Sequence, residues 1–354
     1  MHREYIKKLA DRLKSIHLDK EVRIMEVCGT HTNEFFRSGV KDIFPEKLTL
    51  VNGPGCPVCV TPNDYLDRAI EIGKKYDPII TTFGDMIKVP SSYSSLGREM
   101  TDGMDVRIIY SPMEALNIAQ HNPDREIIFL SVGFETTAPT EAVAVIEAKK
   151  RNLANFSILP GNKLVPPAVK ALLDAEVKID CFIIPGHVSA IIGEEIWNFI
   201  ANEYSKPSVI AGFETPDLII SVLSLLDMYL NNKNEVRNEY KRFVKKEGNK
   251  KAVECLYEVY EKEDALWRGI GTIPESGLAI KDSYSEFDSS IRFPVTPPPP
   301  KEPIGCRCGE LLRGIITPPD CPLFGTSCLP ESPVGPCMVS SEGPCTAYFK
   351  YRSE

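Results

Sequence analysis

The segment Glu126–Pro139, "EIIFLSVGFETTAP", contains the pattern that decides the fold. An apolar, β-branched run leads directly into a Gly-containing turn, and apolar residues with helical spacing follow over Thr140–Arg151. A strand that passes through a short turn into a helix is the repeating unit of parallel sheets covered by helices on both faces. The turn then lies at the carboxyl end of the strand, where open α/β sheets hold their sites.

The same pattern recurs along the chain. Short apolar runs that end in Gly- or Pro-rich turns predict strands at Val22–Val27, Leu48–Asn52, Pro78–Phe83, Val106–Tyr110, Glu126–Val132, Phe156–Pro160, Cys181–Pro185 and Ser208–Gly212. Segments with helical spacing lie between them at Asp64–Lys75, Pro112–Gln120, Thr140–Arg151 and Pro166–Ala175. We therefore expect an α/β fold with two small parallel-sheet domains, at residues 1–120 and 121–232, each built from four of these strands in chain order.

Two similar loops raise the question of an internal duplication. "GFETTAP" at Gly133 and "GFETPD" at Gly212 each follow a predicted strand and precede a helix. A duplication would explain them, and so would a shared strand-to-helix turn with a capping Thr. Under either interpretation they lie at the carboxyl ends of strands, as do "CGTHT", "GPGCPVC", "TFGDM" and "PGHVS". We expect this edge to be the functional face.

The pattern changes after Leu230. The segment Asn234–Asp264 is charged and predicts one or two helices, and "TPPPP" at Thr296–Pro300 predicts a stiff, extended connector. The remainder, Lys301–Glu354, has too few aliphatic residues to build a core of its own, so it needs a cross-link or a metal. We expect residues 233–354 to form a helical segment followed by a C-terminal Cys-rich domain.

Charge and hydropathy exclude two classes of partner. The 354 residues carry a net charge of −8, which argues against a nucleic-acid-binding protein, and the basic run Lys241–Lys251 lies among acidic neighbours as a solvated face would. The N-terminal residues contain no apolar core of signal-peptide length, and the apolar run Leu218–Leu230 is too short to span a bilayer and contains Asp227. We expect a cytoplasmic protein without a membrane partner.

Eleven cysteines are informative in a cytoplasmic protein, because thiols there are kept reduced and structural disulfides are rare. Six of them lie between Cys306 and Cys345 at wide spacings. Structural zinc sites favour Cys-x2-Cys pairs, which this segment lacks, whereas four thiolates on loops suit a [4Fe–4S] cluster. Zinc and unliganded thiols remain the alternatives.

Four cluster ligands leave two cysteines over. A pair beside a cluster can cycle between dithiol and disulfide, as in the cluster-linked disulfide of ferredoxin:thioredoxin reductase. The Cys-x-Cys element places one thiol on the cluster and the other beside it. On this basis we predict the cluster ligands Cys306, Cys321, Cys328 and Cys345, and the adjacent redox pair Cys308 and Cys337.

Three further cysteines lie on the predicted functional edge. Cys28 comes directly after the first strand with His31 close by, and a nearby His or a helix N-terminus would lower the pKa of its thiol. The alternative is a buried small residue, with His31 as a cap or hydrogen-bond donor. Cys56 and Cys59 form a Cys-x-x-Cys element, which serves as a zinc knuckle, a dithiol switch, a cluster ligand pair or a tight turn.

Four other residues carry chemistry of their own. Glu135 in "GFETT" and His187 in "PGHVS" are single titratable groups on the same edge, where catalytic and structural roles are both open. Cys181 and Cys255 lie inside apolar runs, and we predict that they are packing residues.

Taken in order, "CGTHT", "GPGCPVCVTP", "GFETTAP", "PGHVSAIIG", "FGTSC" and "GPCMVSSEGPC" resemble the HypD family of [NiFe]-hydrogenase maturation factors, from Glu26 to Phe349. The resemblance implies a [4Fe–4S] cluster and a complex with the small chaperone HypC, on which the Fe(CN)2CO unit of the hydrogenase is assembled. Cyanide would come from HypE, which carries it as a thiocyanate made from carbamoyl phosphate by HypF. The hydrogenase large subunit would be served indirectly.

The resemblance also implies residue roles. Cys28 would hold the iron, shared with the N-terminal cysteine of a HypC-like partner, and Cys56 and Cys59 would be a redox-active dithiol near it. Iron with cyanide and carbonyl ligands needs soft thiolates in a shielded pocket, so the expected protein is an assembly scaffold rather than a stand-alone enzyme. One rival is a cluster-dependent protein thiol–disulfide reductase. Another, a zinc-stapled adaptor, gives Cys28 and the Cys-x-x-Cys element no role.

Overall fold

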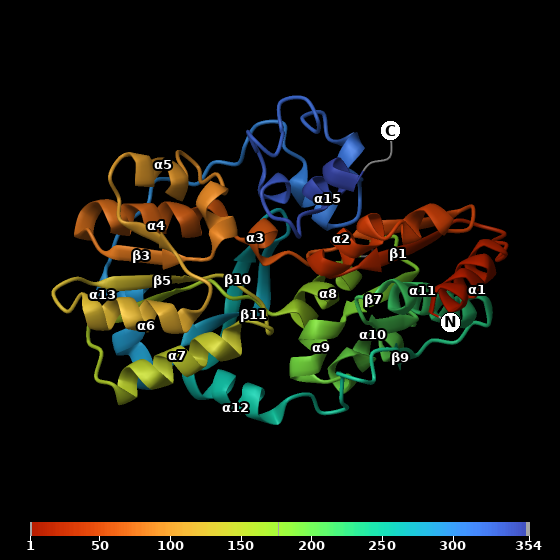
Figure 1. Cartoon of the computed structure of the whole chain (residues 1–354), viewed down its shortest axis with the longest axis horizontal. Helices are drawn as coiled ribbons and strands as arrows, with labels where there is room; N and C mark the ends of the chain where they lie inside the picture. The colour runs from red at the N-terminus through yellow and green to blue at the C-terminus, as the bar shows by residue number, and fades with distance from the viewer. Residues whose placement is uncertain (1, 176, 352–354) are drawn as a thin grey trace.

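Two parallel β-sheets organise the structure, a computed structural model that describes residues 2–175 and 177–351 (Figure 1). The larger sheet has five strands in the order β2–β1–β7–β8–β9, all parallel. Their bounds are Leu48–Asn52 (β2), Val22–Glu26 (β1), Cys181–Pro185 (β7), Ser208–Ala211 (β8) and Val236–Asn238 (β9). Strands β7 and β8 are buried along their whole length, as expected for strands covered by helices on both faces.

The second sheet has four parallel strands in the order β4–β3–β5–β6. They span Val106–Ile108 (β4), Ile79–Thr82 (β3), Ile127–Ser131 (β5) and Phe156–Pro160 (β6). The α/β class with two parallel sheets is therefore confirmed, and the structure contains each of the eight strands predicted from the apolar runs.

The strands are not divided between the sheets in chain order, which differs from the sequence-based grouping at 1–120 and 121–232. After β2 the chain leaves the larger sheet, builds the whole of the smaller one, and returns at β7. Parallel strands are joined by long crossovers, so adjacency in sequence does not fix adjacency in a sheet. Numbered by their own chain order, the first four strands of both sheets follow the same order, 2–1–3–4, with β9 added at one edge.

The two similar loops do not occupy equivalent places in this arrangement. "GFETTAP" follows β5, the third strand of its sheet, whereas "GFETPD" follows β8, the fourth strand of the other. The second loop begins α11 with a capping box between Glu214 and Asp217. The first loop has no such cap, because α7 begins after Thr137, whose side chain makes no capping hydrogen bond. The two loops therefore share a strand-to-helix position in sequence but not the capping geometry.

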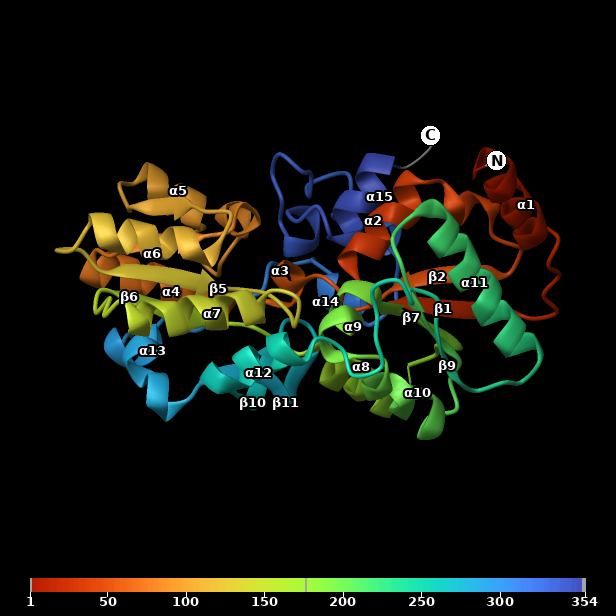
Figure 2. The same cartoon turned by 60° about the horizontal axis from the view of Figure 1, so that its bottom comes forward.

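Helices cover both sheets, as Figures 1 and 2 show. Around the larger sheet lie α1 (His2–Lys14), α2 (Gly29–Arg37), α8 (Val165–Asp174), α9 (Gly186–Ile192), α10 (Asn198–Asn202) and α11 (Thr215–Leu230). Around the smaller sheet lie α4 (Asn63–Tyr76), α5 (Leu96–Thr101), α6 (Pro112–His121), α7 (Ala138–Lys150) and α13 (Ser289–Arg292). The short helix α3 (Pro57–Val60) lies between the two halves.

The charged segment after Leu230 is helical only in part. Within Asn234–Asp264 the structure has β9, then α12 (Lys250–Val259), and then the start of strand β10 (Tyr260–Trp267). Strand β10 pairs antiparallel with β11 (Gly271–Ile280). The helix prediction is confirmed for α12 and wrong for both strands, because the charged side chains that suggested a solvated helix lie on the exposed part of β10.

Residues 301–351, here called the Cys-rich region, lie above the junction of the two halves in Figure 1. They contain α14 (Cys308–Leu312), α15 (Pro344–Tyr351) and single turns of 3-10 helix, η5 (Pro318–Asp320) and η6 (Pro336–Met338). Helix α15 packs against α2, and η6 packs against α3.

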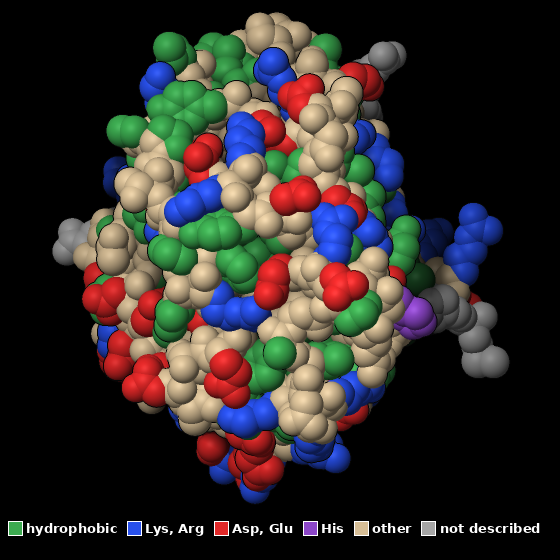
Figure 3. Space-filling model, turned by 90° about the vertical axis from the view of Figure 1, so that its left-hand side faces the viewer, with side chains coloured by type: hydrophobic (Ala, Val, Ile, Leu, Met, Phe, Trp, Pro, Cys, Tyr) green, Lys and Arg blue, Asp and Glu red, His purple; other side chains and the backbone are tan. Residues whose placement is uncertain are grey.

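Among the described residues, no helix combines the length and apolar character needed to cross a membrane. On the face of the four-stranded half shown in Figure 3, lysine and arginine side chains alternate with aspartate and glutamate. This face therefore offers no continuous basic surface.

Candidate functional site

Cys28 lies at the point where the order in which the chain adds strands to the larger sheet reverses. Strand β1 ends at Glu26, and Cys28 is the N-cap residue of α2, with its side chain buried. Strand β1 has two neighbours in the sheet: β2, the next strand of this sheet along the chain, lies on one side of it, and β7 lies on the other. Open α/β sheets bind ligands at this reversal of strand order, so Cys28 has the position expected of a site residue.

A buried carboxyl holds the Cys28 backbone. Glu26 accepts hydrogen bonds from the Cys28 backbone N–H (2.9 Å), from Asn52 Nδ2 (2.6 Å) and from the Thr32 hydroxyl. Burial raises the pKa of Glu26 to about 8, although these hydrogen bonds oppose the shift. Glu26 thus joins β1, β2 and α2 beneath the thiol.

The environment of the Cys28 thiol opposes ionisation. Burial raises its pKa to about 12, and the nearby carboxyls of Glu342 and Glu26 act in the same direction. The backbone amides of His31 and Thr30, at the start of α2, lower it by less. The expectation of a lowered thiol pKa is therefore wrong for the protein as it stands, because desolvation outweighs the helix N-terminus.

His31 belongs to an aromatic stack. Its Nε2 lies 3.0 Å from the carbonyl oxygen of Gly212, and its ring stacks on Phe213 with 4.4 Å between centroids. His187 also stacks on Phe213, at 3.8 Å. Burial lowers the pKa of His31 to about 4 and also lowers that of His187. The structure brings both predicted histidines to the carboxyl edge of the larger sheet, where burial favours the neutral form of each ring.

The loop after β2 packs directly on the loop after β1. The backbone N–H of Gly53 donates to the Glu26 carbonyl (2.7 Å), and the N–H of Gly29 donates to the Gly55 carbonyl (2.9 Å). A Cβ atom on Gly55 would lie 2.2 Å from the Cys28 nitrogen, so only glycine fits there. The two motifs "CGTHT" and "GPGCPVC" therefore form one structural unit.

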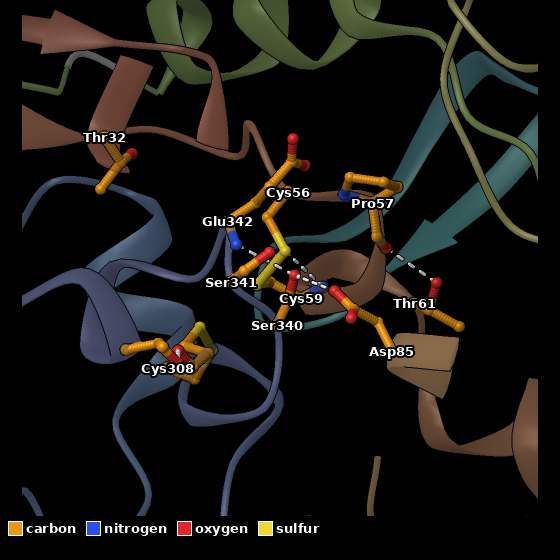
Figure 4. Close-up of a disulfide and its surroundings, with 12 residues drawn as sticks. Thr32, Cys56, Pro57, Cys59, Thr61, Asp85, Cys308, Ser340, Ser341 and Glu342 are labelled. Carbon is orange, nitrogen blue, oxygen red and sulfur yellow. Dashed lines mark hydrogen bonds between the residues drawn. A yellow bond between two sulfur atoms is a disulfide. The ribbon is translucent and has the colours of Figure 1, made fainter. Parts of the chain in front are cut away.

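A disulfide joins Cys56 and Cys59, with 5.2 Å between their Cα atoms (Figure 4). Cys56 caps the N-terminus of α3, and its Sγ accepts a hydrogen bond from the Cys59 N–H (3.2 Å). Both side chains are buried. The Cys-x-x-Cys element has the sulfur pairing of a dithiol switch in its oxidised form.

The six cysteines of the Cys-rich region converge on one small cavity. Cys308 and Cys337 are joined by a disulfide, with 6.6 Å between Cα atoms. The other four are free: Cys306, Cys321, Cys328 and Cys345. Their partition into a pair and four free thiols thus matches the one inferred from the sequence, while the ligand role itself stays a prediction.

The Cys-rich region connects the carboxyl edges of both sheets. The Thr30 hydroxyl, at the start of α2, donates to Glu342 Oε1 (2.8 Å). The Ser340 hydroxyl donates to Asp85 Oδ2 (2.8 Å), in the 3-10 helix η2 (Gly84–Lys88) that follows β3. Figure 4 shows Ser340, Glu342 and Asp85 around the Cys56–Cys59 disulfide, with Cys308 nearby.

Glu135 lies apart from these thiols. It follows β5 and lines a largely apolar cavity of about 800 Å³ together with Phe199 and Tyr257. Its Oε1 accepts a hydrogen bond from the Val165 N–H (2.9 Å), and its buried Oε2 has no partner within the described residues. Burial raises its pKa to about 8.

Comparison with known proteins bears on this arrangement. The family model HypD, described as the hydrogenase formation hypA family, matches residues 3–352. The chain belongs to the HypD family. The resemblance drawn from the ordered motifs is confirmed.

Individual relatives are similar over nearly their whole length. The chain is 42% identical to the hydrogenase maturation factor HypD of Rhodobacter capsulatus, over 98% of this chain and 93% of that protein. It is 40% identical to HypD of Escherichia coli, over 99% and 94%. It is also 41% identical to a putative hydrogenase expression/formation protein of Methanocaldococcus jannaschii, over 99% and 98%.

Sequence reasoning missed the residues that support the thiols. Glu26 ends an apolar strand, and a charged residue at such a place is a usable indication of a buried site. Asn52, buried at the end of the apolar strand β2, shows the same pattern. Glu342 carries no comparable pattern, because its role depends on contacts between distant segments. Of the two predicted packing cysteines, Cys181 is buried in β7, as expected, whereas Cys255 on α12 is partly exposed.

Proposed function

We propose that this protein is a [NiFe]-hydrogenase maturation scaffold that assembles the Fe(CN)2CO unit together with a HypC-like chaperone and accepts cyanide from a HypE-like donor. One structural relationship carries the proposal. The buried Cys28 thiol, the Cys56–Cys59 pair and the Cys-rich region meet at the carboxyl edges of the two sheets. Membership of the HypD family, whose relatives are named hydrogenase maturation factors, supports it.

The cysteines of the small cavity suit a [4Fe–4S] cluster better than zinc. Tetrahedral zinc needs four donors about 2.3 Å from one point. Structural zinc sites favour Cys-x2-Cys pairs, whereas the four free cysteines here are widely spaced along the chain. A cubane cluster places each thiolate on a different iron, which matches four cysteines around a shared cavity. Cys306, Cys321, Cys328 and Cys345 would hold it, and it would supply electrons one at a time.

Cys28 would hold the iron that is built into the product. A thiolate is a soft ligand suited to iron, and burial excludes water and competing ligands. The proton of the thiol leaves when a metal binds, as it does from cysteine ligands in general. Glu26 fixes the backbone on which the sulfur is mounted, and the chaperone would supply a second thiolate.

Cys56 and Cys59 would provide electrons for the release of cyanide. Conversion of a thiocyanate into a thiol and hydrogen cyanide consumes two electrons and two protons. Oxidation of the Cys56/Cys59 dithiol to its disulfide supplies both, so the step balances. Helix α3 packs against η6, which contains Cys337. This contact supports a role for the Cys308–Cys337 pair in returning electrons that reach the cavity from an external one-electron donor.

The rival function, a protein thiol–disulfide reductase, fits the geometry less well. Such an enzyme must present an attacking sulfur to a protein substrate, and reactive cysteines of this kind are partly exposed. Here Cys56 is 1% exposed and Cys59 is fully buried. A buried pair next to a buried thiol suits chemistry on a small group that is delivered into the site.

Infrared spectroscopy tests the proposal. The protein is purified without oxygen together with a HypC-like partner, and we expect cyanide and carbonyl stretching bands from the bound iron. Replacement Cys28→Ala should remove these bands and leave the fold and the visible cluster absorbance intact. The matched control is Cys181→Ala, which removes another buried free thiol, in β7. Normal bands in the Cys28→Ala complex, or none in the native complex, would contradict the proposed function.

A further inference from the structure

Arg268 lies between the two redox elements of the site. It follows β10 and is only 4% exposed. Its backbone N–H donates to the carbonyl of Val60, the last residue of α3 (2.9 Å). The next residue, Gly269, packs so tightly on Gly309 that a Cβ atom there would lie 2.2 Å from the Gly309 Cα. The β10–β11 turn thus contacts both the helix that carries Cys59 and the start of α14.

The charge of Arg268 is incompletely compensated. Its Nε donates to Glu302 Oε2 (3.0 Å), and its Nη2 lies 2.8 Å from the same oxygen but without hydrogen-bond geometry. Within the described residues, Nη1 and Nη2 are buried and have no hydrogen-bond partner. The Glu302 side chain is 63% exposed, so water weakens its attraction. A buried cation with free donors is costly unless negative charge lies near it.

The negative charge available to Arg268 is in the small cysteine cavity. The Arg268 side chain binds Glu302, which lies four residues before Cys306, and the adjacent Gly269 packs on Gly309, which follows Cys308. Cys306 and Cys308 both line that cavity. Four thiolates around an iron–sulfur core carry a net negative charge, and reduction adds one more electron. A fixed cation near the cluster, in a place with little water, stabilises the reduced cluster more than the oxidised cluster, because the reduced cluster carries one more negative charge.

We propose that Arg268 is a charge-compensating residue that stabilises the reduced state of the cluster held by the cysteine cavity and so raises its reduction potential. The inference rests on the proposed function, because it needs that cluster. One electron is added from an external reductant, no bond forms or breaks, and no proton moves, since the guanidinium stays protonated throughout. Arg268 touches neither substrate nor iron and acts only through its charge.

An EPR-monitored redox titration of the full-length protein tests the inference, with dithionite as the reductant. Arg268→Gln should shift the midpoint potential of the cluster to more negative values, and Arg268→Lys should keep it close to the native value. Arg307→Gln is the matched control. Arg307 neighbours Cys306 and Cys308 in the chain, but its side chain is partly exposed and is already paired with Glu310. Its side chain also lies near Cys321, but it is partly exposed and paired, so its loss should shift the potential by less than the loss of Arg268 does.

The outcomes separate the inference from the proposed function. An unchanged potential in Arg268→Gln, or equal shifts in Arg268→Lys, Arg268→Gln and Arg307→Gln, overturns the role of Arg268 and leaves the scaffold function standing. If Arg268→Gln binds no cluster, Arg268→Lys decides: native potential supports the charge requirement, and loss of the cluster there shows a packing role instead. Absence of iron and sulfide from the native protein overturns both.

Discussion

Gly55 lies directly against Cys28, because a Cβ atom at position 55 would lie 2.2 Å from the Cys28 backbone nitrogen. The same nitrogen donates to Glu26, so the thiol is mounted on a backbone that is fixed from two sides. This contact joins the motif that carries Cys28 to the motif that carries Cys56 and Cys59. It places the proposed iron ligand and the proposed dithiol in one rigid unit.

Gly55→Ala should therefore displace Cys28. Overpacking of a tight contact costs about 1–3 kcal/mol. We expect reduced iron loading in infrared spectra of the complex with a HypC-like partner, while cluster absorbance persists. The control is Gly84→Ala, in the 3-10 helix η2 that follows β3, where a new Cβ would meet its nearest neighbour at an ordinary 3.7 Å. Equal iron loading in the two variants would show that the contact between Gly55 and Cys28 can relax without affecting iron binding.

Glu141 should make stability depend on pH. It is fully buried on α7, its Oε2 accepts hydrogen bonds from Ser131 and Asn162, and its Oε1 has no partner within the described residues. Burial raises its pKa to about 7, against about 4.3 in an unfolded chain. Between these values the folded state binds more protons than the unfolded state. Its contribution to the free energy of unfolding is therefore full below about pH 4.3 and is lost as the pH rises through 7.

Relative to Glu141→Gln, the native protein should lose on the order of 2–3 kcal/mol of stability between pH 4.5 and pH 8. Urea unfolding of both proteins at several pH values measures this difference, and their comparison cancels the other buried carboxyls. Glu147→Gln, on the same helix but paired with Arg151, serves as the control and should show no such trend. A native-to-Gln difference that stays constant with pH would refute the buried-acid interpretation.

Strands β1 to β8 were predictable because each is a short apolar run that leads into a Gly- or Pro-rich turn, a pattern that is local in sequence. Sheet membership was not, since nothing local distinguishes β2, which pairs with β1, from β3, which starts the other sheet. Strand β10 was missed because its exposed middle carries the charges of a solvated helix. Pairing with β11, ten residues long, overrides that local preference.

The cysteines of the site were predictable from their types and spacing, but their environment was not. The Cys308–Cys337 pair was inferred from spacing and chemistry. The sequence alone left the use of the Cys-x-x-Cys element open, and the family resemblance indicated the Cys56–Cys59 pair. The direction of the Cys28 pKa shift depends on burial and on Glu342, which is 314 positions away along the chain. Long-range contacts of this kind leave no periodic pattern, so a sequence argument based on the nearby His31 reached the wrong sign.

Loss of a cluster ligand should loosen the Cys-rich region. Few large apolar side chains are buried there, among them Leu311, Leu312 and Met338, so ligation would supply much of its ordering energy. We expect Cys328→Ala to lose the brown chromophore and to become sensitive to protease within residues 301–351. Cys255→Ala, a partly exposed thiol on α12, should stay coloured and resistant. A colourless Cys328→Ala protein that resists protease would show that packing alone orders the region.

Cys56 and Cys59 should interconvert between dithiol and disulfide during function. Their Cα atoms are 5.2 Å apart, within the range that a disulfide spans without backbone movement. The Cys59 N–H already points at Cys56 Sγ, and such a donor stabilises a thiolate when the bond opens. Alkylation of protein trapped at different redox potentials should add two labels together at these positions, as mass spectrometry would show.

Cys56→Ser and Cys59→Ser should each stop assembly of the iron unit while the cluster absorbance persists. Disulfide formation needs both sulfurs, so one remaining thiol cannot complete the two-electron step. Each single variant should therefore lose assembly of the iron unit as fully as the double variant does. The matched comparison is Cys255→Ser, which removes a thiol outside the site and should mature hydrogenase normally. If either single variant also supports maturation at the native rate, the element is a structural turn, and the electrons for cyanide release come from elsewhere.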